Sequence, residues 1–234
     1  MCRAVASDQM MTEMTDRDRA TVPSRALLWL EFIVLFIAVP VAVAVVLPPS
    51  AMFTALFAST LLGVVLLHFT PGFRWRDLLA GRGSFSPVTL ITFAAITAGI
   101  SYAVLATTAP NAIFALFRAN PELWLMIMLL YPLMSALPQE VVFRPLFFRR
   151  YGTILPEGRM ALTLNAGLFS LAHLLYWNWI VALMTFAGGI VFAWAYEVRK
   201  SFPLAVVLHA IAGNVLFTLG MGVFFYSGNV VRPF

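Results

Sequence analysis

The sequence contains few charged residues and a single cysteine. Asp, Glu, Lys and Arg make up 11% of its 234 residues, whereas an ordinary soluble domain contains about 25%. This shortage excludes a soluble globular domain and, with 62% hydrophobic residues, predicts a polytopic membrane protein. The single cysteine, Cys2, excludes an internal disulfide and a cysteine-based metal site. The sequence also lacks internal repeats, low-complexity segments and the HExxH spacing that is typical of zinc proteases.

Apolar runs long enough to cross a bilayer, which takes roughly 20 helical residues, follow one another along most of the chain. They lie at residues 26–47, 51–69, 87–108, 122–148, 160–177, 179–198 and 203–227. We therefore predict an all-α membrane helical bundle of about seven transmembrane helices. The fourth run contains Pro132, Pro138 and Pro145, so we expect this helix to be kinked or broken. Kinks at membrane depth are typical of helices that build a cavity.

The loop charges predict the orientation in the membrane, because cytoplasmic loops carry an excess of Lys and Arg. With the N-terminus inside, the outside loops contain only Arg118 and Arg232. The inside segments then contain Arg3, Arg17, Arg19, Arg25, Arg74, Arg76, Arg82, Arg149, Arg150, Arg159, Arg199 and Lys200. This pattern favours an N-in, C-out protein.

Three segments are expected along the chain. Residues 1–25 are polar and predict a cytoplasmic tail, residues 26–228 form the transmembrane domain, and residues 229–234 form a short C-terminal tail. The expected location is a bacterial cytoplasmic membrane, as a multi-pass integral protein. The net charge of +5 reflects the basic inner loops, so it does not indicate nucleic-acid binding.

Ionisable residues occur inside the predicted spans, where an isolated charge costs a few kcal/mol or more. These residues are Glu140, Arg144, His173 and His209. At about 1.5 Å per helical residue, Glu140 lies about 13 Å from Arg149 at the cytoplasmic end. His209 lies at a similar depth beyond Lys200, and His173 is somewhat deeper. Three helices thus place titratable groups in one band, which predicts a single site that faces the cytoplasm.

Taken one at a time, these residues also fit structural roles. Glu140 and Arg144 are four residues apart and share a helix face, so the spacing suits a structural ion pair as well as a catalytic pair. A lone buried histidine is typical of a side chain that is hydrogen-bonded to a neighbour. Asn214 follows His209 by five residues, about 140° around the helix, and faces elsewhere unless a local bulge rotates it back. The joint occurrence of these residues favours a site.

At these residues the sequence resembles the CPBP family of CAAX-protease and bacteriocin-processing, or abortive-infection, intramembrane proteases. The family pattern is EExxxR on one helix, FxxxH on a later one and HxxxN or HxxxD on another. Here the three motifs read QEVVFR from Gln139, FSLAH from Phe169 and HAIAGN from His209. The resemblance covers about residues 120–217, with the motifs in the family order.

The resemblance implies an intramembrane endopeptidase of the CAAX-protease type, in which glutamate and histidine activate water near the cytoplasmic face. Carried over, His173 is the partner that positions the water, and Arg144 orients Glu140. His209 is the oxyanion donor, with Asn214 as its candidate helper. The expected substrate is a peptide or membrane protein in the bilayer. No cofactor, metal or nucleic acid is expected, and the oligomeric state is left open.

Two departures from the family pattern bear on activity. Gln139 replaces the first glutamate of the pair, which is the one usually assigned as catalytic, and a glutamine cannot act as a base. Gly213 stands where the third motif has its amide, and Asn214 follows one residue later. Either Glu140 takes the base role after a small rotation of the helix beside Pro138, or the protein is a weak or inactive relative.

Two further hypotheses therefore stay open beside the endopeptidase. One is a non-catalytic membrane scaffold that binds or regulates a partner protein in the same cavity. The other is a haem protein, in which His173 and His209 ligate a b-type haem between two spans. The haem hypothesis leaves the Glu140–Arg144 pair without a role.

Overall fold

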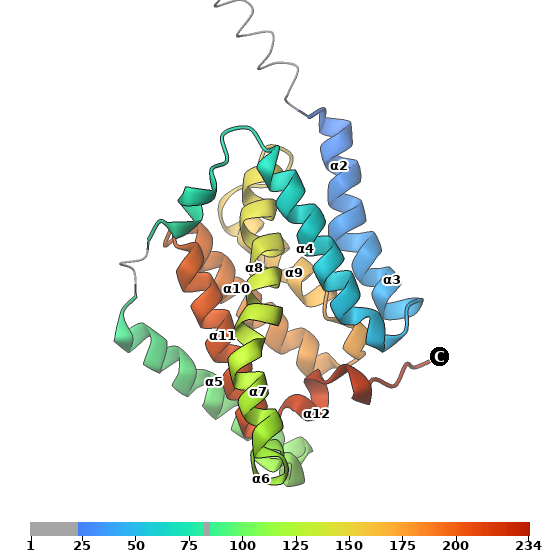
Figure 1. Ribbon diagram of the computed structural model, residues 1–234, viewed down its shortest axis with the longest axis vertical. Helices are drawn as coiled ribbons and strands as arrows, with labels where there is room; N and C mark the ends of the chain where they lie inside the picture. The colour runs from blue at the N-terminus through green and yellow to red at the C-terminus, as the bar shows by residue number, and fades with distance from the viewer. Residues whose placement is uncertain (1–22, 82–84) are drawn as a thin grey trace, which may run out of the picture.

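The computed structural model of the chain describes residues 23–81 and 85–234, and within these ranges every regular element is helical (Figure 1). Nearly all of the predicted tail at residues 1–25 lies outside the described residues. The same holds for Cys2, Arg3, Arg17, Arg19 and Arg82.

The helices follow the apolar runs closely. In chain order they are α2 (Arg25–Ile33), η1 (Val34–Ala38), α3 (Val39–Val45), η2 (Pro49–Ala51), α4 (Met52–His68), η3 (Trp75–Leu79), α5 (Pro87–Thr108), η5 (Pro110–Ala112), α6 (Ala115–Ala119), α7 (Pro121–Tyr131), η6 (Pro132–Ala136), α8 (Leu137–Val141), η7 (Val142–Arg150), α9 (Gly158–Leu171), η8 (Leu174–Tyr176), α10 (Trp179–Glu197), α11 (Phe202–Leu219), α12 (Gly222–Phe225) and η9 (Ser227–Asn229). Within the described ranges, six helices are long and apolar enough to cross a membrane. This confirms the predicted polytopic helical bundle.

The run at residues 160–177 differs from the expected seventh span. Its helix, α9, has 14 residues and ends at Leu171, which is short of the roughly 20 residues that a crossing requires. The chain then turns through Trp177, which has a left-handed backbone with φ of 47°. The Asn178 side chain accepts hydrogen bonds from the first backbone N–H groups of α10. Local turn and capping chemistry therefore ends α9 early, and α9 packs against α10.

The proline-rich fourth run forms one continuous helix of 30 residues, Pro121–Arg150. Its turns widen to π-helix over η6 and η7. A proline has no N–H group, and its ring clashes with the carbonyl four residues earlier. Pro138 lies two residues after the first widened stretch and Pro145 lies inside the second. The helix is thus deformed, not broken, and π-bulges of this kind are frequent at functional sites.

The basic loops gather at one end of the molecule. At this end Arg25 donates to the Thr153 carbonyl, and Arg150 donates to the Thr70 hydroxyl. The Ser201 hydroxyl donates to the Gly81 carbonyl. The start of α2 and the end of α4 therefore lie at the top of Figure 1, and the start of α11 lies in its upper half, packed against η3. The two outer arginines, Arg118 and Arg232, bind backbone carbonyls at the opposite end.

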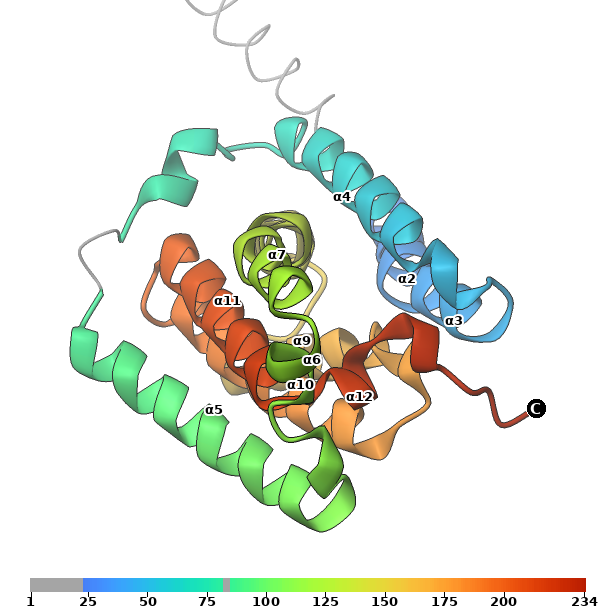
Figure 2. The same ribbon diagram turned by 60° about the horizontal axis from the view of Figure 1, so that its bottom comes forward.

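The fourth helix runs through the interior of the bundle. Figure 2 shows α7 between the α2–α4 side and α11, with α5 outside α11. Further along the same helix, α8 packs against both α4 and α11, and η7 packs against α4 and α10. The main hydrophobic core lies around this second half and includes Phe36, Phe147, Phe169 and Leu208. The motif residues of the fourth helix are thus surrounded by protein.

Candidate active site

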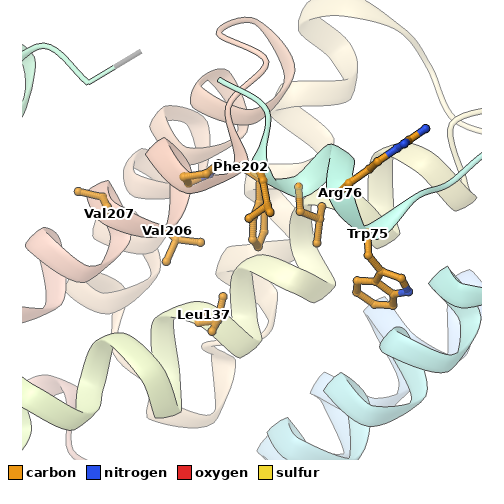
Figure 3. Close-up of a pocket in the computed structure, with 9 residues that line it drawn as sticks. Trp75, Arg76, Leu137, Phe202, Val206 and Val207 are labelled. Atoms are coloured by element: carbon orange, nitrogen blue, oxygen red, sulfur yellow. The ribbon is translucent and has the colours of Figure 1, made fainter. Parts of the chain in front are cut away.

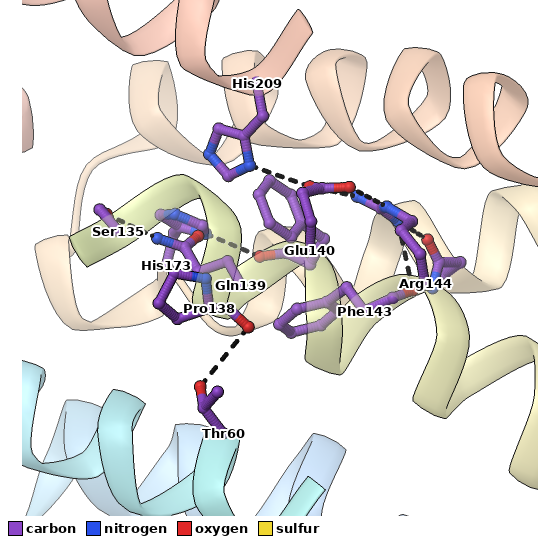
Figure 4. A network of polar contacts seen from close by, with 11 residues as sticks. Thr60, Ser135, Pro138, Gln139, Glu140, Phe143, Arg144, His173 and His209 are labelled. Carbon is purple, nitrogen blue, oxygen red and sulfur yellow. Dashed lines mark hydrogen bonds and ion pairs between the residues drawn. The ribbon is translucent and has the colours of Figure 1, made fainter. Parts of the chain in front are cut away.

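Glu140 is the centre of a buried polar network (Figure 4). Its side chain, like that of Arg144, is 0% exposed. Arg144 Nε donates to Glu140 Oε2 at 2.8 Å, and Arg144 Nη2 donates to Oε1 at 3.3 Å. His209, from α11, places Nδ1 2.9 Å from the same Oε1. A carboxylate can only accept, so His209 Nδ1 is the donor, and both oxygens of Glu140 are occupied.

Further contacts hold Arg144 in place. Asn165 of α9 accepts a hydrogen bond from Arg144 Nη1 through Oδ1, and its Nδ2 donates to the Phe143 carbonyl at 2.7 Å. The guanidinium carbon lies 5.3 Å from the centroid of the Phe169 ring and 5.9 Å from that of Phe192, within the range of cation–π attraction. Sequence analysis missed Asn165, although a fully buried amide in an apolar helix signals a polar partner.

His173 lies in the turn that ends α9, where helix geometry no longer occupies all backbone carbonyls. Its Nδ1 is 2.7 Å from the Phe169 carbonyl oxygen. Because that oxygen can only accept, Nδ1 carries the proton, which leaves Nε2 to act as an acceptor. The ring also stacks on Tyr176 with an interplanar angle of 19°. The motif spacing of Phe169 and His173 therefore fixes both the ring orientation and the tautomer.

Gln139 lies on α8 beside Glu140, and only one of the two polar groups of its side-chain amide is hydrogen-bonded. Its Nε2 donates to the Ser135 hydroxyl at 2.9 Å, whereas its Oε1 is buried and has no hydrogen-bond partner among the described residues. The preceding Pro138 carbonyl accepts a long hydrogen bond of 3.4 Å from Thr60 of α4. Gln139 thus presents an unsatisfied acceptor.

A cavity of about 740 Å³ joins three of the predicted residues. Gln139, His173 and His209 line it, and most of the remaining lining is apolar. Within the described part of the chain, neither Glu140 nor Arg144 lines this cavity. The predicted site residues therefore form two groups. Gln139, His173 and His209 face the cavity, whereas the Glu140–Arg144 ion pair lies outside it and is joined to His209 by the hydrogen bond of Glu140.

The third motif is arranged differently from the other two. The Asn214 side chain donates to the Met128 carbonyl at 3.3 Å, and its Oδ1 has no partner in the described ranges. Gly213 lines the cavity instead. The space above Gly213 is filled by the ring of Tyr131, since a Cβ added to the glycine would lie 1.9 Å from Tyr131 Cε1.

Tyr131 and Ser135 also line the cavity, and sequence analysis missed both. Together with Gln139 they are spaced four residues apart along the fourth helix, so they share one face. A polar residue at every fourth position of an otherwise apolar span was the signal that could have identified them.

A second pocket lies away from this network, between η3 and the start of α11 (Figure 3). It has a volume of about 650 Å³, and its lining includes Trp75, Arg76 and Phe202. None of the motif residues lines it. The candidate site is therefore the cavity that His173 and His209 share.

The fold and the site define an integral membrane protein of several helices with a Glu–Arg–His network behind an apolar cavity. A family model described as Rce1-like, type II CAAX prenyl endopeptidase Rce1-like, matches residues 121–215. This segment contains all three motifs, and the match confirms the predicted resemblance to the CPBP family of CAAX-protease-type intramembrane endopeptidases over these residues. Comparisons with curated proteins and with solved structures found no match.

Proposed function

We propose that this protein is an intramembrane endopeptidase that hydrolyses a peptide bond of a membrane-associated or peptide substrate. The observation that supports it best is the convergence of Gln139, His173 and His209, from three separate elements, on one cavity. The family match over residues 121–215 supports the same class of reaction.

The proposed base is His173. Its Nδ1 proton is held by the Phe169 carbonyl, so the lone pair of Nε2 is free to accept a proton from water. As that proton leaves, the water oxygen bonds to the substrate carbonyl carbon and the carbonyl oxygen becomes an oxyanion. When the tetrahedral intermediate collapses, the C–N bond breaks and His173 returns the proton to the departing amine.

Glu140 acts as a positioning residue in this proposal. Both of its oxygens are occupied by Arg144 and His209, so it would have to break these contacts to reach a water in the cavity. From its buried place it fixes the orientation of the His209 ring and offsets a positive charge on that ring. A doubly protonated His209 donates from Nε2 toward the oxyanion, which is the preorganised stabilisation that acyl transfer requires.

We place the site toward the cytoplasmic side of a bacterial membrane, with the N-terminus inside. The orientation is supported by the basic loops, which share one end of the bundle, where Arg25 and Arg150 make their contacts. The depth of the site is supported by Glu140, which lies ten residues before Arg150 on one continuous helix, about 15 Å from that end. The positive-inside rule assigns such an end to the cytoplasm.

The test uses purified protein in liposomes, incubated with membranes from cells that lack it, while new peptide N-termini are quantified by mass spectrometry. We expect the wild type to generate new termini and His173→Ala to abolish them. His68→Ala is the matched control, because His68 is an exposed histidine at the end of α4 and should cleave as the wild type does. Full activity of a folded His173→Ala variant would refute the proposed mechanism.

Specific observations favour a second candidate, a non-catalytic scaffold that binds a peptide in the same cavity. Gln139 cannot act as a base, and its unpartnered Oε1 can accept an N–H group from a bound peptide backbone. The ring of Tyr131 covers the glycine of the third motif. If the wild type generates no new termini, while a photo-crosslinker near Gln139 captures peptides from the same membranes, the scaffold is the better description.

A further inference from the structure

The contact between Tyr131 and Gly213 is the tightest of those that glycines make within the motif-bearing helices. A Cβ on Gly213 would lie 1.9 Å from Tyr131 Cε1, 2.2 Å from Cζ and 2.7 Å from Cδ1. No side chain larger than hydrogen fits there while the tyrosine stays in place. The Tyr131 ring, which comes from α7, therefore fills the volume into which a side chain at position 213 would project.

Tyr131 stands beside the reacting groups of the proposed site. Its ring centroid is 6.0 Å from that of His209, in an edge-on arrangement at 68°, and it lines the same cavity as His173. The ring of Phe217 also packs against it, with the two centroids 5.6 Å apart. These contacts hold the ring at the edge of the cavity, which Ser135 also lines.

The chemistry of the site gives this hydroxyl a use. Hydrolysis of a peptide bond places a negative charge on the carbonyl oxygen, and preorganised donors stabilise it. The Asn214 amide donates to the Met128 carbonyl of α7 and is not among the residues that line the cavity. A phenol is a good donor, and Tyr131 supplies one where position 213 supplies nothing.

We infer that the Tyr131 hydroxyl is an oxyanion donor of this site, replacing the amide that glycine at position 213 cannot provide. The inference rests on the proposed endopeptidase function and adds a catalytic residue that lies outside the three motifs, eight residues before Gln139 on the same continuous helix. It also explains why Gly213 and Tyr131 occur together, because either one alone would leave a clash or a void.

The first experiment separates the hydroxyl from the ring. The peptide that spans the most strongly cleaved site in the N-terminal comparison serves as the probe, and its kcat and KM are measured in liposomes. Tyr131→Phe keeps the ring and should lower kcat by roughly 10²–10³, the usual effect of losing one oxyanion donor, with KM nearly unchanged. Replacing Tyr131 by 3-fluorotyrosine retains the donor and should preserve most of kcat.

The second experiment exchanges the two side chains. Tyr131→Ala vacates the space above Gly213 and should lower kcat at least as far as Tyr131→Phe does. Adding Gly213→Asn to this variant puts an amide into the vacated space, and we expect a partial recovery of kcat. Gly213→Asn in the wild-type background should instead be destabilised, because the tyrosine is still present.

The outcomes distinguish the two claims. If His173→Ala abolishes cleavage but Tyr131→Phe keeps the wild-type kcat, the tyrosine is only a packing residue, and the donor role is refuted while the endopeptidase stands. If the wild-type protein cleaves nothing, both claims fall. A fall in kcat for Tyr131→Phe, with the wild-type melting temperature and partial recovery in the exchanged variant, supports the donor role.

Discussion

Replacing Glu140 by alanine should destabilise the protein strongly, whatever its activity. The variant removes the only carboxylate that contacts Arg144 among the described residues, while the guanidinium remains 0% exposed. In the hydrogen bonds that remain, Arg144 donates to neutral oxygens of Asn165 and Phe143. His209 loses its hydrogen-bond acceptor at the same time.

The magnitude follows from the burial of the pair. Removing one partner of a buried ion pair costs about 3–5 kcal/mol, because the other charge stays buried without compensation. For a chain of this size, about 2–4 °C of melting temperature corresponds to 1 kcal/mol. We therefore expect Glu140→Ala to lower the melting temperature by roughly 6–20 °C. Glu140→Gln retains an acceptor for one donor, so its melting temperature should lie between those of Glu140→Ala and the wild type.

Thermal unfolding in detergent, followed by intrinsic tryptophan fluorescence, measures these differences. Glu197→Ala is the matched control. It also removes a glutamate paired with a nearby cation, but its 2.7 Å bridge to Lys200 is exposed, at 38% and 70% of the two side chains. Exposed pairs of this kind contribute about 0–1 kcal/mol. Glu31→Ala should be intermediate, since Glu31 pairs with Arg150 at 2.7 Å and is 16% exposed.

The order of the three variants is the decisive result. Equal melting temperatures for Glu140→Ala and Glu197→Ala would show that burial does not determine how much an ion pair contributes to stability. The placement of Glu140 at the centre of the network would then be refuted. A large loss for Glu140→Ala together with a small loss for Glu197→Ala supports it.

Four shorter predictions concern the same cavity. Gln139→Glu puts a carboxylate that can act as a second base, beside His173, at the cavity and should raise the cleavage rate by about 10²-fold or more; an unchanged or lower number of new N-termini per minute would refute this expectation. Gly213→Ala should lower the melting temperature because its Cβ meets the ring of Tyr131, whereas Gly99→Ala, which meets nothing within 4 Å, should not. EDTA should leave the cleavage rate unchanged, since the proposed steps use imidazole groups; loss of activity that zinc restores would overturn this. Purified protein should show no Soret band, and a band lost in His209→Ala would favour the haem hypothesis.

The sequence predicted much of the candidate site because charge inside a membrane span is costly. His209 is 69 residues from Glu140 in the sequence, yet it forms one hydrogen-bonded network with Glu140 and Arg144. Their shared depth was computed from helix rise alone. The spacing of Glu140 and Arg144 also indicated correctly that the two residues share a helix face.

The parts that the sequence did not predict depend on rotation about helix axes and on local turns. Depth along a helix says nothing about which neighbouring residue faces a cavity, so the adjacent residues Gln139 and Glu140 could not be separated. Tyr131 and Asn165 lie outside the three motifs, although their helices carry motif residues, and only packing brings them to the site. The early end of α9 depends on the turn chemistry at Trp177, which an apolar run conceals.

The sequence alone determined that this is a helical membrane protein with its basic loops at one end, and it predicted titratable groups at one depth. These properties follow from the cost of exposing backbone groups and charges to hydrocarbon, which every span must satisfy individually. Only the tertiary structure decided that Gln139 faces the cavity while Glu140 supports His209 from behind, and that Tyr131 covers Gly213. Such choices depend on how side chains of several helices fill a shared volume, and no single segment contains that information.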